Sequence, residues 1–158
     1  MSLYAVVLFV HSYLRWIVLG LLVTVIVRSL VGWRRERDWL RVDDRLHVAL
    51  VKTVYVQFLL GLILYLFLSP FSAAFFANVG PSLKHPVLRF FGLEHGVTMF
   101  AAVGIIHEAR KRTSRAKSPS LRHRGVWITT LIALLVICAA IPWPFLQHGR
   151  PLLRAVSS

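Results

Sequence analysis

Apolar residues in this chain fall into four long runs that are separated by polar connections. The runs cover about residues 3–27, 48–68, 87–106 and 126–146. Each run has roughly the 20 residues that a helix needs to cross the hydrocarbon layer of a membrane. Backbone groups find no water inside a bilayer, and the alternating pattern of a membrane β-barrel is missing here. The pattern therefore predicts four transmembrane helices.

Composition supports an all-α membrane protein with one domain over residues 1–158. Of the 158 residues, 57% are apolar and 16% are charged, and the mean hydropathy is +0.67. Soluble domains are only about 45–50% apolar. These values exclude a disordered chain, a disulfide scaffold and a coiled coil. We therefore predict a transmembrane four-helix bundle with up-down-up-down topology.

The basic residues indicate how this bundle is oriented. Most of them flank the first and third connections, and few, among them Arg89 and Arg150, lie on the opposite side. Because Lys and Arg gather in cytoplasmic loops, we expect a bacterial inner-membrane protein with cytoplasmic basic loops and both termini outside. This topology explains most of the net charge of +13, so the bilayer is the expected partner and nucleic acid is not. The flanking residues are Arg28, Arg34, Arg35, Arg37, Arg41, Arg45, Lys52, Arg110, Lys111, Arg112, Arg115, Lys117, Arg122 and Arg124.

The outer connection, residues 70–86, is too apolar for a simple linker. Phe71, Phe75 and Phe76 have the spacing of one helix face, which predicts a short helix in the membrane interface. The fourth run closes at Pro142 and Pro144, which cannot continue a helix.

Of the polar side chains that interrupt the apolar runs, five stand out. Such groups are costly in lipid, so they are expected inside the bundle. His11 and His95 lie at the same depth, about 12 Å along two helices that run in the same direction. Two inward imidazoles on diagonal helices would suit a low-spin haem b with two axial histidines. The five residues are His11, Arg15, Gln57, Glu94 and His95.

Other residues near this pair would suit a porphyrin. Gly92 and Gly96 flank His95 and would admit a flat ring, or else a neighbouring helix. Arg15 and Arg89 would compensate propionate charge. Met99, one turn from His95, would pack on the ring, or else simply fill the core.

Interpretations without haem also fit these residues. Arg15 would then pair with Glu94, and the two histidines would bond to hydroxyls in a network that holds the helices together. Another metal or a proton path is a further alternative. Gln57 would bond to a neighbouring helix or to a quinone.

The remaining histidines give weaker signals. His47 and His107 lie roughly level near the cytoplasmic side, where a second haem would need its ligands. Both border charged residues, which favours solvated histidines instead. His85, His123 and His148 are expected to face solvent.

Several segments together resemble small bacterial four-span membrane proteins labelled as b-type cytochromes. The resemblance rests on His11–Trp16, on Gln57 with Gly61–Tyr65, on Glu94–His95 and on Ile141–Phe145. It implies haem, electron transfer in the cytoplasmic membrane, and His11 and His95 as ligands. Diheme membrane cytochromes have matched histidine pairs at both membrane faces. In this chain only the outer pair is well buried.

Two functional hypotheses follow. The first is a b-type cytochrome that carries single electrons or anchors a partner, and not a complete oxidoreductase. It would work with a membrane-protein partner or as a homo-oligomer. The second is a structural or assembly subunit without a cofactor. A proton-coupled transporter is disfavoured because inverted repeats and broken helices are missing.

Overall fold

A computed structural model describes residues 2–153, and within them all regular secondary structure is helical. Four helical columns are long and apolar enough to cross a membrane. The prediction of an all-helical chain with four helices that could span a membrane is therefore confirmed. The columns are Leu3–Arg34, Arg41–Leu68, Pro86–Arg115 and Pro119–Ala139.

Two columns are single helices and two contain a π-helical turn. The first is α1 (Leu3–Arg34) and the fourth is α7 (Pro119–Ala139). The second joins α2 (Arg41–Ile63) to the π-helical segment η1 (Leu64–Leu68). The third joins α5 (Pro86–Arg89), the π-helical segment η2 (Phe90–Glu94) and α6 (His95–Arg115). The short helices α3 (Pro70–Ala77) and α4 (Val79–Lys84) connect the second column to the third.

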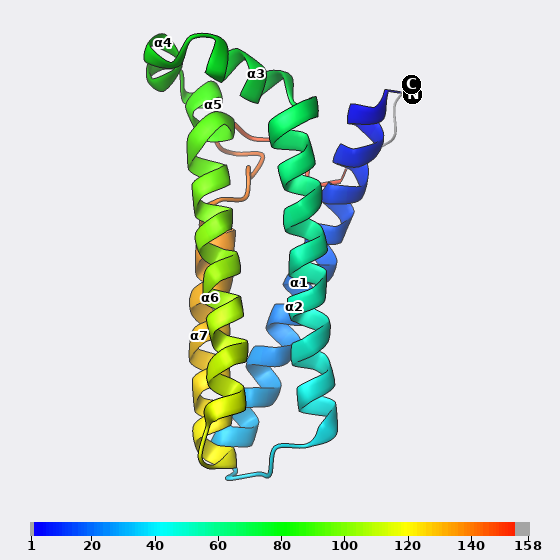
Figure 1. The fold of residues 1–158 in the computed structure, drawn as a ribbon, viewed down its shortest axis with the longest axis vertical. Helices are drawn as coiled ribbons and strands as arrows, with labels where there is room; N and C mark the ends of the chain where they lie inside the picture. The colour runs from blue at the N-terminus through cyan, green and yellow to red at the C-terminus, as the bar shows by residue number, and fades with distance from the viewer. Residues whose placement is uncertain (1, 154–158) are drawn as a thin grey trace.

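The long helices form a ring around one apolar core. Helix α1 packs on α2 and α7, and α6 packs on the same two neighbours. Leu22, Leu50 and Ile106 are fully buried at the centre. The links 35–40 and 116–118 lie at one end of the molecule, here called the basic end (Figure 1). Helices α3 and α4 lie at the opposite end, here called the cap end.

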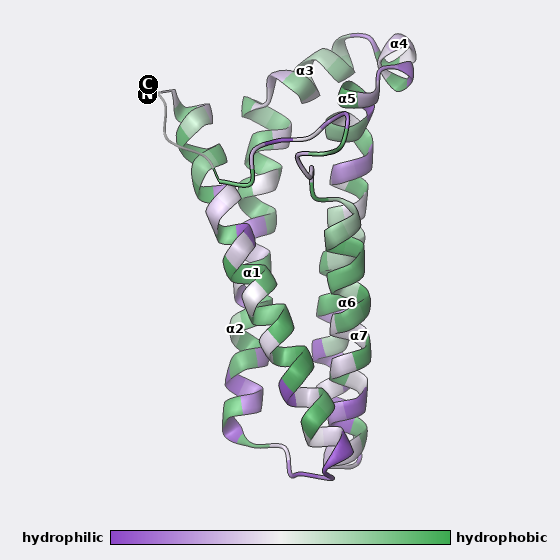
Figure 2. Cartoon of the chain, turned by 180° about the vertical axis from the view of Figure 1, so that it is seen from behind, coloured by the Kyte–Doolittle hydropathy of each residue, from purple (hydrophilic) through white to green (hydrophobic). Residues whose placement is uncertain are grey.

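Apolar residues dominate the middle of the helices, and hydrophilic residues gather towards the basic end (Figure 2). The helices nevertheless extend past the apolar runs. Helix α7 starts at Pro119, after its N-cap Ser118, and not at 126. The starts of α2 and α7 bury polar side chains, because these turns still pack inside the bundle.

Two histidines at the basic end contradict the prediction of solvated rings. His47 and His123 are both 0% exposed. His47 lies near the Thr113 hydroxyl, and His123 packs against Trp39 and over Gly32. His107 does face outwards, where it bonds to Tyr55. The structure therefore does not bring His47 and His107 together as a matched pair.

Helix α7 ends earlier than predicted. It stops at Ala139, not at 146, so Pro142 and Pro144 lie outside the helix. Residues 140–153 then form an irregular segment, here called the strap. Because α7 is short, the strap occupies the cap end where another helical turn would otherwise stand.

The cap end is packed tightly around Gly92. A Cβ atom built on Gly92 would overlap the Phe75 ring of α3, which is 4% exposed. Phe76 is instead 55% exposed, and Phe71 lines an internal cavity. The sequence predicts that these three phenylalanines share one helix face. The structure contradicts this prediction, because their side chains have different surroundings.

Gly92→Ala is expected to lower the free energy of unfolding by about 1–3 kcal/mol, the usual cost of overpacking a core. Thermal or denaturant unfolding in detergent would measure it. Gly104→Ala is the matched control, because a Cβ there meets nothing within 4 Å. A similar loss in both variants would contradict this role of Gly92.

Candidate functional site

A cavity of about 430 Å³ lies between the helical columns and beneath the strap. This volume is in the range of cofactor and small-molecule sites, which are about 300–1,000 Å³. Most of its wall is apolar. Side chains distant in sequence nevertheless bring polar groups to it from α1, α2, α6 and the strap. These groups belong to His11, Arg15, Gln57, His95 and Arg150.

His95 follows directly after the π-helical turn η2 and faces the cavity. Its Nδ1 lies 2.8 Å from the carbonyl oxygen of Ala140. The last carbonyls of a helix lack partners within the helix, and Ala140 is the C-cap of α7. The ring nitrogen must donate to this carbonyl, so Nε2 of a neutral His95 carries a lone pair.

His11 and Gln57 form a second polar pair across α1 and α2. The Gln57 amide nitrogen donates to the His11 carbonyl oxygen at 3.0 Å, which fixes the amide orientation. The same nitrogen lies 3.3 Å from His11 Nε2. Because an amide nitrogen only donates, Nε2 of His11 is the acceptor and carries a lone pair. The buried His11 Nδ1 and Gln57 Oε1 have no hydrogen-bond partner in residues 2–153.

The two imidazoles therefore share one feature. Both residues line a cavity with mostly apolar walls, and their hydrogen bonds leave Nε2 as the unprotonated nitrogen of each neutral ring, although that of His11 already accepts from Gln57. A metal needs this form of histidine, and ligating histidines usually donate their other nitrogen to a carbonyl or carboxylate. His95 already has that arrangement through Ala140. The donor set thus fits a haem with two axial histidines.

The strap forms part of the cavity wall between α7 and α1. Arg15 Nη2 and Trp16 Nε1 donate to the Leu152 carbonyl oxygen at 2.9 and 3.2 Å. His148 of the strap stacks on Phe90 with ring centroids 3.6 Å apart. This ring is half-buried, so the prediction of a solvent-facing His148 is wrong. Its burial lowers the pKa of His148 below the ordinary value.

The structure places the predicted site residues in two groups. His11, Arg15, His95, Gly96 and Met99 line the cavity. Gly92 packs on Phe75 instead, and Arg89 forms an ion pair with Glu94.

The Arg89–Glu94 pair corrects the prediction of an interior Glu94. Arg89 Nε lies 2.6 Å from a Glu94 oxygen, and both side chains are about 45% exposed. Glu94 is therefore neutralised at the surface, where it has no contact with Arg15. Glu94 is next to His95 in the sequence, but neighbouring residues of a helix point in different directions. An interior His95 therefore does not imply an interior Glu94.

Arg150 is the cavity residue that sequence reasoning missed. It was assigned to the outer surface by its position after the fourth run. The available signal was the segment Ile141–Arg150, in which prolines and a glycine predict turns but not the direction of the chain.

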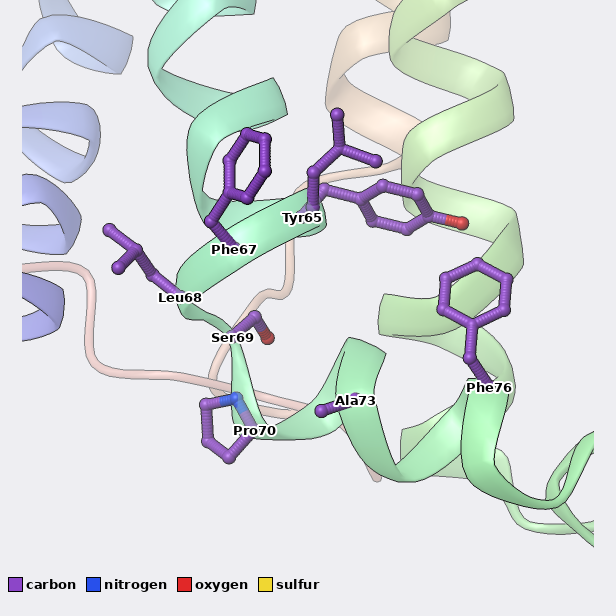
Figure 3. A pocket seen from close by; sticks show the side chains of 8 residues that line it. Tyr65, Phe67, Leu68, Ser69, Pro70, Ala73 and Phe76 are labelled. Atoms are coloured by element: carbon purple, nitrogen blue, oxygen red, sulfur yellow. The ribbon is translucent and has the colours of Figure 1, made fainter.

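A second, shallower groove lies where η1 turns into α3 (Figure 3). Apolar side chains line it, among them Phe67, Leu68 and Phe76. Tyr65 also contributes to this wall, and its hydroxyl donates to the Gly92 carbonyl oxygen at 2.6 Å. No histidine or charged side chain lines the groove. The chemistry therefore centres on the larger cavity.

The described residues contain no cluster of three or more His, Cys, Asp or Glu side chains suited to a metal ion. A haem would need only two axial histidines from the protein. Comparisons with known protein families, characterised proteins and solved structures gave no match for this chain.

Proposed function

We propose that this chain is a membrane-embedded b-type cytochrome that binds haem b between α1 and α6. His11 and His95 are the axial ligands. The bundle has up-down-up-down topology in the bacterial cytoplasmic membrane, with the basic end in the cytoplasm and both termini outside. Its role is that of a one-electron carrier or an anchor subunit.

The observation that carries the proposal is the shared state of the two imidazoles. Both residues line one cavity with largely apolar walls, and the hydrogen bonds of each neutral ring leave Nε2 as its unprotonated nitrogen. Haem supplies one-electron chemistry, and the protein supplies its ligands and surroundings. Gly96 and Met99, which also line the cavity, would contact the porphyrin. Iron bound to His11 would take over the lone pair that the Gln57 amide now contacts.

A second candidate function is that of a structural or assembly subunit without a cofactor. It is favoured by the hydrogen bonds that His95, Gln57 and Arg15 already make to backbone carbonyls. Such bonds join helices in a membrane. In either function the chain would act with a membrane-protein partner or a second copy. A quinone is a candidate redox partner.

An absorption spectrum of the purified chain separates the two functions. Protein from haem-replete cells is expected to show a sharp reduced-minus-oxidised haem b spectrum with about one haem per chain. A colourless preparation that is fully folded by circular dichroism would contradict the cytochrome proposal and leave the structural subunit.

A further inference from the structure

Arg150 is a cation held in aromatic surroundings at the cap end of the cavity. Its guanidinium carbon lies 4.5 Å from the Phe71 ring centroid and 5.2 Å from that of Phe91. These rings belong to α3 and η2, and they pack on each other at 5.2 Å. Phe91 precedes His95 by about one helical turn, on the cap-end side of that residue.

The backbone around Arg150 fixes its position. The Arg150 amide donates to the Pro142 carbonyl oxygen at 3.0 Å, and the Gly149 amide donates to Leu146 at 2.8 Å. A Cβ on Gly149 would lie 2.5 Å from the Trp143 carbonyl oxygen, so a residue with a side chain does not fit this turn and glycine does. On the other side of Arg150, the Leu152 carbonyl oxygen accepts hydrogen bonds from Arg15 and Trp16. Arg150 is therefore anchored on both sides.

The charge of Arg150 is not balanced by a carboxylate of the described chain. No ion pair to Arg150 is found in residues 2–153. The acidic residues other than Glu94 belong to the basic end, and Glu94 pairs with Arg89. A partly buried cation is costly unless a partner offsets its desolvation. Arg guanidinium binds carboxylates through two parallel hydrogen bonds.

We propose that Arg150 recognises the acidic group of the ligand in this cavity. For haem, this group would be a propionate, which Arg150 would hold at the cap end of the cavity. The inference rests on the proposed function, and it adds the residue that sets the orientation of the ligand. It assigns this role to the strap and not to Arg89, whose charge Glu94 already neutralises.

The test compares haem with haem dimethyl ester, which keeps the iron and the ring but lacks the carboxylate charges. Full-length protein from haem-depleted cells is titrated with each compound in detergent. The wild type is expected to bind haem about tenfold more tightly than the ester, since the ester lacks the carboxylate oxygens that accept charge-assisted hydrogen bonds from a guanidinium. Arg150→Gln should lose most of this preference. Arg89→Gln is the matched variant at the same end, and it should keep the preference.

The outcomes separate this inference from the proposed function. An unchanged preference for haem in Arg150→Gln would overturn the role of Arg150 and leave haem binding intact. If neither compound gives a two-histidine spectrum with the wild type, the proposed function itself fails. If Arg150→Gln does not fold, Arg150→Lys replaces it. Lysine keeps the charge but lacks the planar fork, so an intermediate preference is expected and an unchanged one counts against the inference.

Discussion

His95→Ala is expected to leave the full-length protein without bound haem. The substitution removes one axial ligand and the hydrogen bond from Nδ1 to the Ala140 carbonyl oxygen. Loss of a partner that only orients a metal ligand already costs about 10–100-fold in affinity, so loss of the ligand itself should cost more. Absorption spectra of the purified variant, taken with and without reducing agent, measure the effect.

Two additions separate ligation from a structural role of His95. Free imidazole, soaked into the vacated space, should restore part of the haem spectrum in His95→Ala. His85→Ala is the matched control, because His85 is an exposed histidine at the same end of the bundle. Full haem content in His95→Ala would show that this histidine is not a ligand.

Asp43→Ala is expected to give a large loss of stability, although Asp43 is remote from the cavity. The Asp43 side chain is 2% exposed and accepts hydrogen bonds from Arg28 and Arg37 at 3.0 Å. It also accepts from the backbone amide of Leu40, the N-cap residue of α2. Breaking a buried ion pair costs about 3–5 kcal/mol. The lower end, about 3 kcal/mol, applies here because both arginines are about a third exposed and can rehydrate.

Unfolding of the detergent-solubilised protein by heat or denaturant measures this loss. The control is Glu108→Ala, which removes an exposed ion pair to Arg112 within one helix. Pairs of that kind contribute little, so no measurable change is expected there. If the two variants were equally stable, the Asp43 cluster would not be what fixes the link 35–40.

The helices and the two cavity histidines were accessible from the sequence because the bilayer imposes strong rules. Long apolar runs must be helical, and a histidine within a run is costly unless it faces the bundle interior. His11 and His95 follow this rule, and both line the cavity.

The prediction that His47 and His123 are solvated is wrong, because charged neighbours in the sequence do not show that a side chain faces solvent. Helices α2 and α7 continue past the membrane-length apolar runs, and their first turns still face the bundle core. The spacing of His123, Val126 and Thr130 follows the helical period and runs into the buried face of α7. The sequence contains this helical periodicity, but the mean hydropathy of a long segment does not reveal it.

The path of the strap could not be predicted from the sequence, for a different reason. Its path depends on where α7 stops and on which surface is then left open. These are long-range features, which local turn signals around Pro142 and Gly149 do not specify. Arg150 therefore reached the cavity from a segment that had been assigned to the outer surface.

The π-helical segment η2 also determines how His95 is aimed. A π turn holds one residue more than an α turn, so it acts as a single-residue insertion within the third column. Each residue of an α-helix is rotated by about 100° from the one before it. Side chains on either side of η2 thus belong to two rotational registers, with exposed Arg89 in one and His95 in the other. The direction of His95 is consequently sensitive to chain length at residues 90–94, where a one-residue deletion would turn the ring relative to the cap end.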